Sequence, residues 1–208
     1  MSTTMNRICL SCVCTLLLAG LLAPAARADI NLEYRTNNPW LVGETVAVQL
    51  YAVSDDPGDY QSFSAIRTIF DWDPNYLELL QVDQTGAVPL MSSGFPSNDA
   101  WGLNEEVPPQ DGDGLYQALA NFNTPVETTT AGVLVTTFLF EALQVTPATP
   151  VNILVEGGNP LYDTAVIDGV IAGLNVTGTL AGTPVEIVPE PATLSLATLG
   201  ILLILRRR

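Results

Sequence analysis

Between residues 29 and 187 the chain alternates apolar and polar residues with the period of a β-strand, and this pattern limits its fold more than any other feature. The alternation is clearest over residues 45–53, 62–72 and 132–144. A period of two residues that is rich in β-branched side chains predicts strands with one buried face. Because no stretch in this range combines a 3.6-residue period with helix caps, we expect an all-β fold.

Turn-forming residues divide the rest of this range into shorter strands. We expect strands over residues 30–34, 76–82, 115–122, 151–155, 161–167, 169–171, 174–180 and 185–188. Pro147 and Pro150 are expected to end the strand over 132–144. Many short strands joined by turns favour an antiparallel β-sandwich. Since neither a repeat nor a linker interrupts residues 29–187, the sequence predicts one domain there.

This central part of the chain is strongly acidic. Residues 29–187 contain 21 acidic side chains and only two basic ones, Arg35 and Arg67, which gives a net charge of −19. Such a surface repels nucleic acid and anionic lipid, so we exclude both as partners. It suits either the solubility of an exported protein or the attraction of divalent cations.

The N-terminal residues 1–28 have the three parts of a secretory signal peptide. Arg7 gives a positive start, an apolar run follows from Ile8 to Leu22, and the small residues Ala26 and Ala28 suit a signal peptidase. We therefore expect an N-terminal signal helix, cleavage after Ala28 and export. All three cysteines lie within this segment, so residues 29–187 contain no thiol and no disulfide.

The C-terminal residues 188–208 also have three parts. The stiff tripeptide Pro189-Glu190-Pro191 comes first, an uncharged apolar run follows, and Arg206, Arg207 and Arg208 end the chain. A helix over residues 192–205 would be about 21 Å long, which is short against a hydrocarbon core of about 30 Å. The flanking arginines nevertheless indicate a short transmembrane helix, because such charges stay on the cytoplasmic side.

In the order of these parts, the C-terminal segment resembles the PEP-CTERM sorting tail of Gram-negative bacteria. The resemblance implies that an exosortase-type membrane protease cuts near Pro189-Glu190-Pro191, after transient insertion in the inner membrane. It also implies delivery to the cell surface or to the extracellular matrix. The alternative is a plain C-terminal anchor that is never cleaved.

Three stretches of the central part together resemble a cohesin domain, the jelly-roll module that binds dockerins. They are residues 42–48, residues 70–82 with the sequence FDWDPNYLELLQV, and residues 132–140. The resemblance implies a cohesin-like β-sandwich and a dockerin-like protein partner. Because the family is related in fold to cellulose-binding modules, it also implies polysaccharide as an alternative ligand. We expect the chain to depart from cellulosomal proteins in three ways: a sorting tail, no dockerin-like segment of its own and no second module.

Few side chains of residues 29–187 could carry out catalysis. The range contains no His, Cys or Lys, which excludes catalytic triads, thiol nucleophiles and Schiff bases. Paired carboxylates remain for glycoside hydrolysis, either Asp71 with Asp73 or Glu105 with Glu106. Nothing singles out one pair among 21 acids, so we expect a protein that is not an enzyme.

Two acidic loops are candidate calcium sites. Asp111 and Asp113 alternate with glycine, as in the first part of an oxygen-rich calcium loop, and Asp55, Asp56 and Asp59 form the second loop. Ordinary solvated turns have the same composition, and the sequence leaves both interpretations open. We expect no other cofactor.

Carbohydrate binding would require exposed aromatic side chains. The candidates in the sequence are Trp40, Tyr51, Tyr60, Trp72, Trp101, Tyr116 and Tyr162. Trp101 is the strongest of them, because it lies in a polar, irregular stretch over residues 91–110. The sequence therefore predicts an exported, non-catalytic binding protein. Its ligand is a protein or a polysaccharide, and hydrolysis is the remaining alternative.

Overall fold

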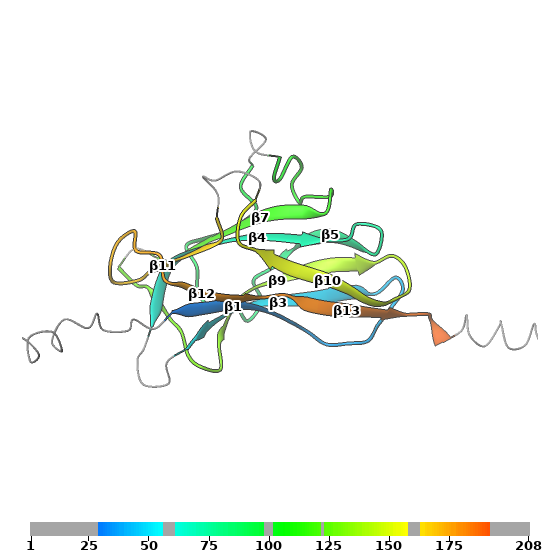
Figure 1. Cartoon of the computed structure of the whole chain (residues 1–208), viewed down its shortest axis with the longest axis horizontal. Coiled ribbons are helices and arrows are strands. Elements are labelled where there is room, and N and C mark those ends of the chain that lie inside the picture. The colour runs from blue at the N-terminus through cyan, green and yellow to red at the C-terminus, as the bar shows by residue number, and fades with distance from the viewer. Residues whose placement is uncertain (1–28, 56–60, 98–101, 122, 158–162, 192–208) are drawn as a thin grey trace, which may run out of the picture.

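The structure is a computed structural model that describes residues 29–55, 61–97, 102–121, 123–157 and 163–191 of the 208-residue chain. All elements of this part are strands, and they form two sheets that face each other (Figure 1). The all-β prediction is therefore confirmed. The expected N-terminal signal helix and C-terminal membrane helix lie outside the described residues.

The smaller sheet has five strands in the order β12-β1-β3-β9-β5. Its strands are β1 (Ile30–Thr36), β3 (Thr45–Ser54), β5 (Leu77–Asp83), β9 (Val133–Ala142) and β12 (Thr177–Ala181). Strand β3 shows why the sheet forms, since its even-numbered residues from Val46 to Ser54 are buried and its odd-numbered residues lie outward. This is the pattern that the alternation in the sequence predicts.

The larger sheet follows the order β2-β13-β10-β4-β7-β6, and β8 and β11 also pair with β4. Its strands are β2 (Trp40–Leu41), β4 (Ser62–Trp72), β6 (Ser92–Gly94), β7 (Asp113–Leu119), β8 (Val126–Glu127), β10 (Thr146–Leu154), β11 (Ala165–Asp168) and β13 (Thr183–Val188). Strand β4 is central because it pairs with four others along its length.

Aromatic side chains join the two sheets in the core. Phe138 of the smaller sheet lies 4.8 Å from Phe70 and 5.4 Å from Tyr116 of the larger sheet, measured between ring centroids. All three side chains are fully buried. Burying a side chain of this size contributes about 2–3 kcal/mol. A core of this extent accounts for a fold that needs no disulfide.

Two pairs of strands depart from the expected antiparallel arrangement. Strand β12 runs parallel to β1, and β13 runs parallel to β2. The chain passes from β12 in the smaller sheet to β13 in the larger sheet through Gly182, where a Cβ would lie only 2.7 Å from the Val151 carbonyl oxygen. Gly182 therefore lets the chain pass close to the β10 backbone as it moves from one sheet to the other.

The prediction that Pro147 and Pro150 end a strand is wrong, because β10 begins at Thr146 and includes both. The register of β10 against β13 is irregular between Thr146 and Thr149, so the ladder skips Pro147. Pro150 lies opposite Pro184, where neither residue has an amide to donate. The expected strand over residues 169–171 is a turn, and the sequence did not predict the short strands β2, β6 and β8.

The two ends of the described chain lie at opposite ends of the sandwich (Figure 1). The cleavage residues Ala26 and Ala28, like Arg206, Arg207 and Arg208, lie outside the described residues. Within the part of the chain that is described, no helix is long and apolar enough to cross a membrane.

Candidate functional site

The outer face of the larger sheet carries a row of apolar side chains that lie across three strands. Ile167 of β11 pairs with Ala65 of β4, which pairs with Leu119 of β7. Residues directly opposite each other share a face of the sheet, so the three side chains lie side by side. Leu119 is 40% exposed, and Met91 beside it is 45% exposed. We call these four residues the apolar row.

Two adjoining hollows follow the apolar row. One is lined by Ala65, Arg67, Gln117, Leu119 and Ile167, among others. The second is lined by Ala65, Met91, Leu119, Asn121, Asn123 and Pro125, among others. They share Ala65 and Leu119, so the surface is continuous between them. In the segment that follows β11, Val170 is 83% exposed and Ile171 is 52% exposed.

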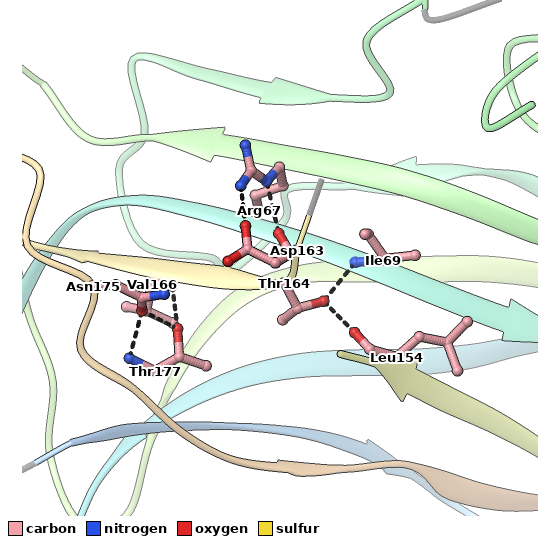
Figure 2. Close-up of polar contacts among 8 residues, drawn as sticks. All are labelled: Arg67, Ile69, Leu154, Asp163, Thr164, Val166, Asn175 and Thr177. Carbon is pink, nitrogen blue, oxygen red and sulfur yellow. Dashed lines mark hydrogen bonds and ion pairs between the residues drawn. The ribbon is translucent and has the colours of Figure 1, made fainter. Parts of the chain in front are cut away.

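Strand β11 is held against β4 by polar contacts of the two residues that precede it, Asp163 and Thr164 (Figure 2). The Arg67 guanidinium forms an ion pair with the Asp163 carboxylate, and its Nε donates to the Asp163 carbonyl oxygen at 2.8 Å. Thr164 Oγ1 accepts the Ile69 amide at 3.0 Å and donates to the Leu154 carbonyl oxygen. Thr164 therefore satisfies backbone hydrogen-bonding groups of β4 and β10 at the point where β4 changes its pairing partner from β10 to β11.

The far side of β11 is fixed by Thr177. Its Oγ1 accepts the Val166 amide at 2.7 Å, and both its amide and its hydroxyl donate to Asn175 Oδ1 (Figure 2). Strand β11 is thus bound on both sides along its short length. The Ile167 side chain is presented by a rigid element, which lowers the entropy cost of binding a partner.

The other half of this outer face is covered. Ile69 of β4 and Leu115 of β7 are fully buried beneath Leu103, and Leu154 packs against them. Asn104 holds the covering segment in place: Nδ2 donates to the Leu115 and Pro96 carbonyl oxygens at 2.7 Å, and Oδ1 accepts the Leu115 amide at 2.8 Å. The Asn104 side chain thereby replaces a neighbouring strand at the edge of β7.

The predicted calcium residues lie at the end of the covered half. Asp113 is not in a turn, as the sequence analysis expected, but is the first residue of β7 and pairs with Asp71 of β4. Burial raises the pKa of the Asp113 carboxyl, and the nearby charges of Asp111 and Asp71 raise it further. Its Oδ1 is buried without a hydrogen bond. Among the described residues, no three acidic side chains are grouped so that they could hold a metal ion.

The carboxylates that were considered for hydrolysis have other partners. Asp73 Oδ1 accepts the amide and the side chain of Asn75 at 2.9 and 2.8 Å, so this residue caps the turn between β4 and β5. Asp71 Oδ1 accepts Asn152 Nδ2 at 2.9 Å. Glu105 and Glu106 are both exposed. The 70–82 motif is structural, since Trp72 Nε1 also donates to the Leu77 carbonyl oxygen at 2.9 Å.

The candidate aromatic ligands are not assembled into a platform in the described part. Trp72 and Tyr116 belong to the core, Trp40 is half-buried, and Tyr51 is half-buried with the Arg35 guanidinium 4.0 Å above its ring. Trp101, Tyr60 and Tyr162 lie outside the described residues. Every aromatic side chain among the described residues is buried or half-buried.

The tripeptide Pro189-Glu190-Pro191 follows β13 directly. The Val42 amide donates to the carbonyl oxygen of Val188, the last residue of β13, at 3.2 Å. Glu190 and Pro191 line a hollow together with Leu41, the last residue of β2, and residues 42–44, the turn that follows it. The tripeptide is therefore joined to the folded domain with no spacer, although Glu190 and Pro191 are themselves exposed.

Sequence reasoning did not single out Leu119, Ile167 or Asn104. Alternation shows that a strand has two faces but not which apolar residues remain exposed, because exposure depends on the segment that covers the sheet. Asn104 lies in a stretch that reads as irregular, and its backbone φ of 55° is uncommon outside glycine. Only the preference of asparagine for this region hints at its position.

Comparison with solved structures identifies the fold. The chain resembles a cohesin module from a family 33 glycoside hydrolase of Clostridium perfringens, with a TM-score of 0.54 and 15% identity over 79% of this chain and 100% of that one. The fold is that of a cohesin module. Two further cohesins resemble the chain, and both were solved in complexes with a dockerin. One is from Clostridium thermocellum (TM-score 0.52, 15% identity, 76% and 99% coverage).

The other is the cohesin CaCohA2, solved at pH 5.5 with a variant of the dockerin CaDoc0917 (TM-score 0.50, 11% identity, 76% and 99% coverage). No protein-family model matches the sequence, and no curated protein matches it. The cohesin-like fold that the sequence motifs predicted is therefore confirmed by structure alone.

Proposed function

We propose that this protein is an exported, non-catalytic module that binds a protein partner through the apolar row. The observation that carries the proposal is the aligned set of Ile167, Ala65 and Leu119, continued by Met91. Leu119 and Met91 are exposed, whereas Ile167 and Ala65 are half-buried. An apolar area on a rigid sheet with a more polar surround is typical of protein interaction sites. Two cohesins of the same fold are in complexes with a dockerin, which supports a dockerin-like partner for this chain.

A protein partner fits this face better than a polysaccharide. Sugars stack on flat aromatic rings, whereas the apolar row consists of aliphatic side chains and one methionine. Aliphatic side chains and methionine instead pack against the apolar face of a partner's helix or strand. The same composition gives no acid–base pair, so catalysis forms no part of the proposal.

The sorting of the protein forms the second part of the proposal. Residues 1–28 provide a signal peptide, and residues 188–208 provide a Pro-Glu-Pro tripeptide, an apolar run and terminal arginines. We propose that an exosortase-type protease processes this tail and that the acidic domain then acts at the cell surface or in the extracellular matrix. The net charge of −19 keeps such a domain soluble and apart from anionic lipid.

A matched pair of substitutions tests the binding face. Leu119→Asp places a charge in the apolar row, whereas Leu80→Asp places the same charge on β5 of the other sheet, at nearly equal exposure (40% and 38%). Wild-type and variant proteins would be immobilised, and captured envelope proteins would be cross-linked and identified. We expect the partner to be lost with Leu119→Asp and kept with Leu80→Asp.

Two outcomes would contradict the proposal. One is equal capture by the two variants, which would place the partner elsewhere. The other is binding to purified exopolysaccharide that Leu119→Asp leaves unchanged, which would favour the carbohydrate alternative.

A further inference from the structure

The Pro-Glu-Pro tripeptide is attached to the domain at a position where the backbone is fixed. Ile187, two residues before Pro189, is 1% exposed, and Val185 is fully buried. The last strand is also held by Asn38, whose Nδ2 donates to the Pro184 carbonyl oxygen at 2.9 Å and whose Oδ1 accepts the Glu186 amide at 2.9 Å. Strand β13 is therefore an integral part of the larger sheet.

The surface beside the tripeptide comes from the opposite end of the domain sequence. Leu41 and Val42 pair with the end of β13, and residues 41–44 line a hollow together with Glu190 and Pro191. The turn is itself fixed, since Glu44 Oε2 accepts the Leu41 amide at 2.8 Å and the Gly43 amide donates to the Ala142 carbonyl oxygen at 2.8 Å. This arrangement exists only when the sandwich has folded, because its two halves are brought together by the sheet.

We infer that the sorting protease recognises a composite surface, made of Pro189-Glu190-Pro191 together with the β2–β3 turn over residues 41–44. This inference rests on the proposed sorting and adds that the folded domain takes part in it. A protease that enters the chain upstream of Pro189 would have to open β13 and expose Ile187, because a hydrogen-bonded and buried backbone resists cleavage.

A protease that instead binds the tripeptide in place meets a segment that is anchored at its start, since the Val188 carbonyl oxygen accepts the Val42 amide at 3.2 Å. Binding a preorganised segment costs less conformational entropy than binding a free one. The partner that fits is a membrane-embedded peptidase with a site for an extended Pro-Glu-Pro segment and a small contact for the turn. Processing would then select chains whose domain has folded.

The test measures the processing rate of the full-length chain in a producing cell by pulse-chase labelling and the shift in size. In one variant a ten-residue Gly/Ser linker separates Val188 from Pro189, which detaches the tripeptide from the turn without changing any packed residue. A second variant, Leu41→Ser, alters the hollow, and Leu80→Ser on β5 is its control. We expect the linker variant and Leu41→Ser to slow processing about fivefold, as for loss of one interface contact. The control Leu80→Ser should be processed at the wild-type rate.

The outcomes separate this inference from the sorting proposal. If the linker variant is processed at the wild-type rate or faster, the composite surface is refuted while sorting stands. If the wild-type chain is never shortened, or if Glu190→Ala changes nothing, both the sorting proposal and the inference fail. Thermal unfolding of Leu41→Ser separates slow processing from loss of the fold, and the linker variant decides the question if Leu41→Ser unfolds.

Discussion

Leu115 and Leu119 lie on the same strand and the same face of the larger sheet, yet one is fully buried and the other is 40% exposed. Both residues pair with β4, but only Leu119 also pairs with β6. The covering segment differs too, since Leu103 closes over Leu115 and no described side chain closes over Leu119 to the same extent. One half of the face therefore serves stability, and the other half remains for a partner.

In the covered half of the face, backbone polar groups that are shielded from water need a side chain as their hydrogen-bonding partner. Asn104 must satisfy the Leu115 backbone where β6 has ended, and it does so from a left-handed backbone conformation. Beyond Leu115 the next outward pair is Asp71 and Asp113, where burial leaves a carboxylate oxygen without a hydrogen bond. The uncovered half, which carries the apolar row, needs no such side chain, because water can form hydrogen bonds with its polar groups.

The largest effect should come from Asn104→Ala, which removes the side chain that holds the covering segment. The variant loses three hydrogen bonds and leaves the buried Leu115 amide and carbonyl without partners. Each such group costs about 1–3 kcal/mol, so the free energy of unfolding should fall by about 3–4 kcal/mol. Denaturant unfolding measures this change.

Asn123→Ala is the matched control, because Asn123 also has a positive φ (66°) but is exposed. It should cost less than about 1 kcal/mol. Equal losses for the two variants would mean that the left-handed conformation, and not the Leu115 contacts, explains the effect. The two halves of the face would then differ less than the structure indicates.

The same comparison can be made with one residue type. Leu115→Ala should lower the free energy of unfolding by about 3 kcal/mol, because it leaves a cavity under Leu103. Leu119→Ala should cost less than about 1 kcal/mol, since much of its side chain is already in contact with water, yet it should weaken capture of the partner. A stability loss at Leu119 equal to that at Leu115 would contradict the division of the face.

Much of the fold follows from the sequence because alternation reports burial directly. Strands β3, β4 and β9 were predicted within two residues at each end, since their inward positions are filled by Val, Ile, Leu and Phe. The predictions fail where the structure of a segment depends on the strand with which it pairs. Pro147 and Pro150 break a regular ladder, but β10 accommodates them beside β13. Only the position of β13 makes this arrangement evident.

The candidate site was less predictable for a related reason. The 70–82 motif carried the resemblance to cohesins, and within it Asp73 caps the turn between β4 and β5. The apolar row, in contrast, joins Ile167, Ala65 and Leu119, which are far apart in the chain and meet through register alone. An isolated leucine or isoleucine in a strand has the same pattern whether a loop covers it or not. The cohesin resemblance implied a partner but did not distinguish the two halves of this face.

The smallest expected change in stability concerns Asp113, whose carboxylate lies at the end of the covered half. Burial, and then the charges of Asp111 and Asp71, raise the pKa of Asp113 in the folded protein. A raised folded-state pKa favours the folded protein at low pH, and this contribution is lost as the pH rises through that pKa. The ionised carboxylate therefore costs stability at neutral pH. Because solvent screens part of this cost, Asp113→Asn should raise the free energy of unfolding by only about 0.5 kcal/mol, in line with like charges opposed across strands.

The gain from Asp113→Asn should disappear below about pH 4, where the carboxyl of the wild type is protonated in both states. Unfolding by denaturant at neutral and acidic pH, with and without calcium, measures this. If Asp113→Asn is instead less stable than wild type at neutral pH, the ionised carboxylate makes a stabilising interaction and the prediction is wrong. If calcium stabilised the wild type but not Asp113→Asn, the Asp111 and Asp113 pair would be a cation site, and the covered half would bind a ligand as the uncovered half is proposed to do.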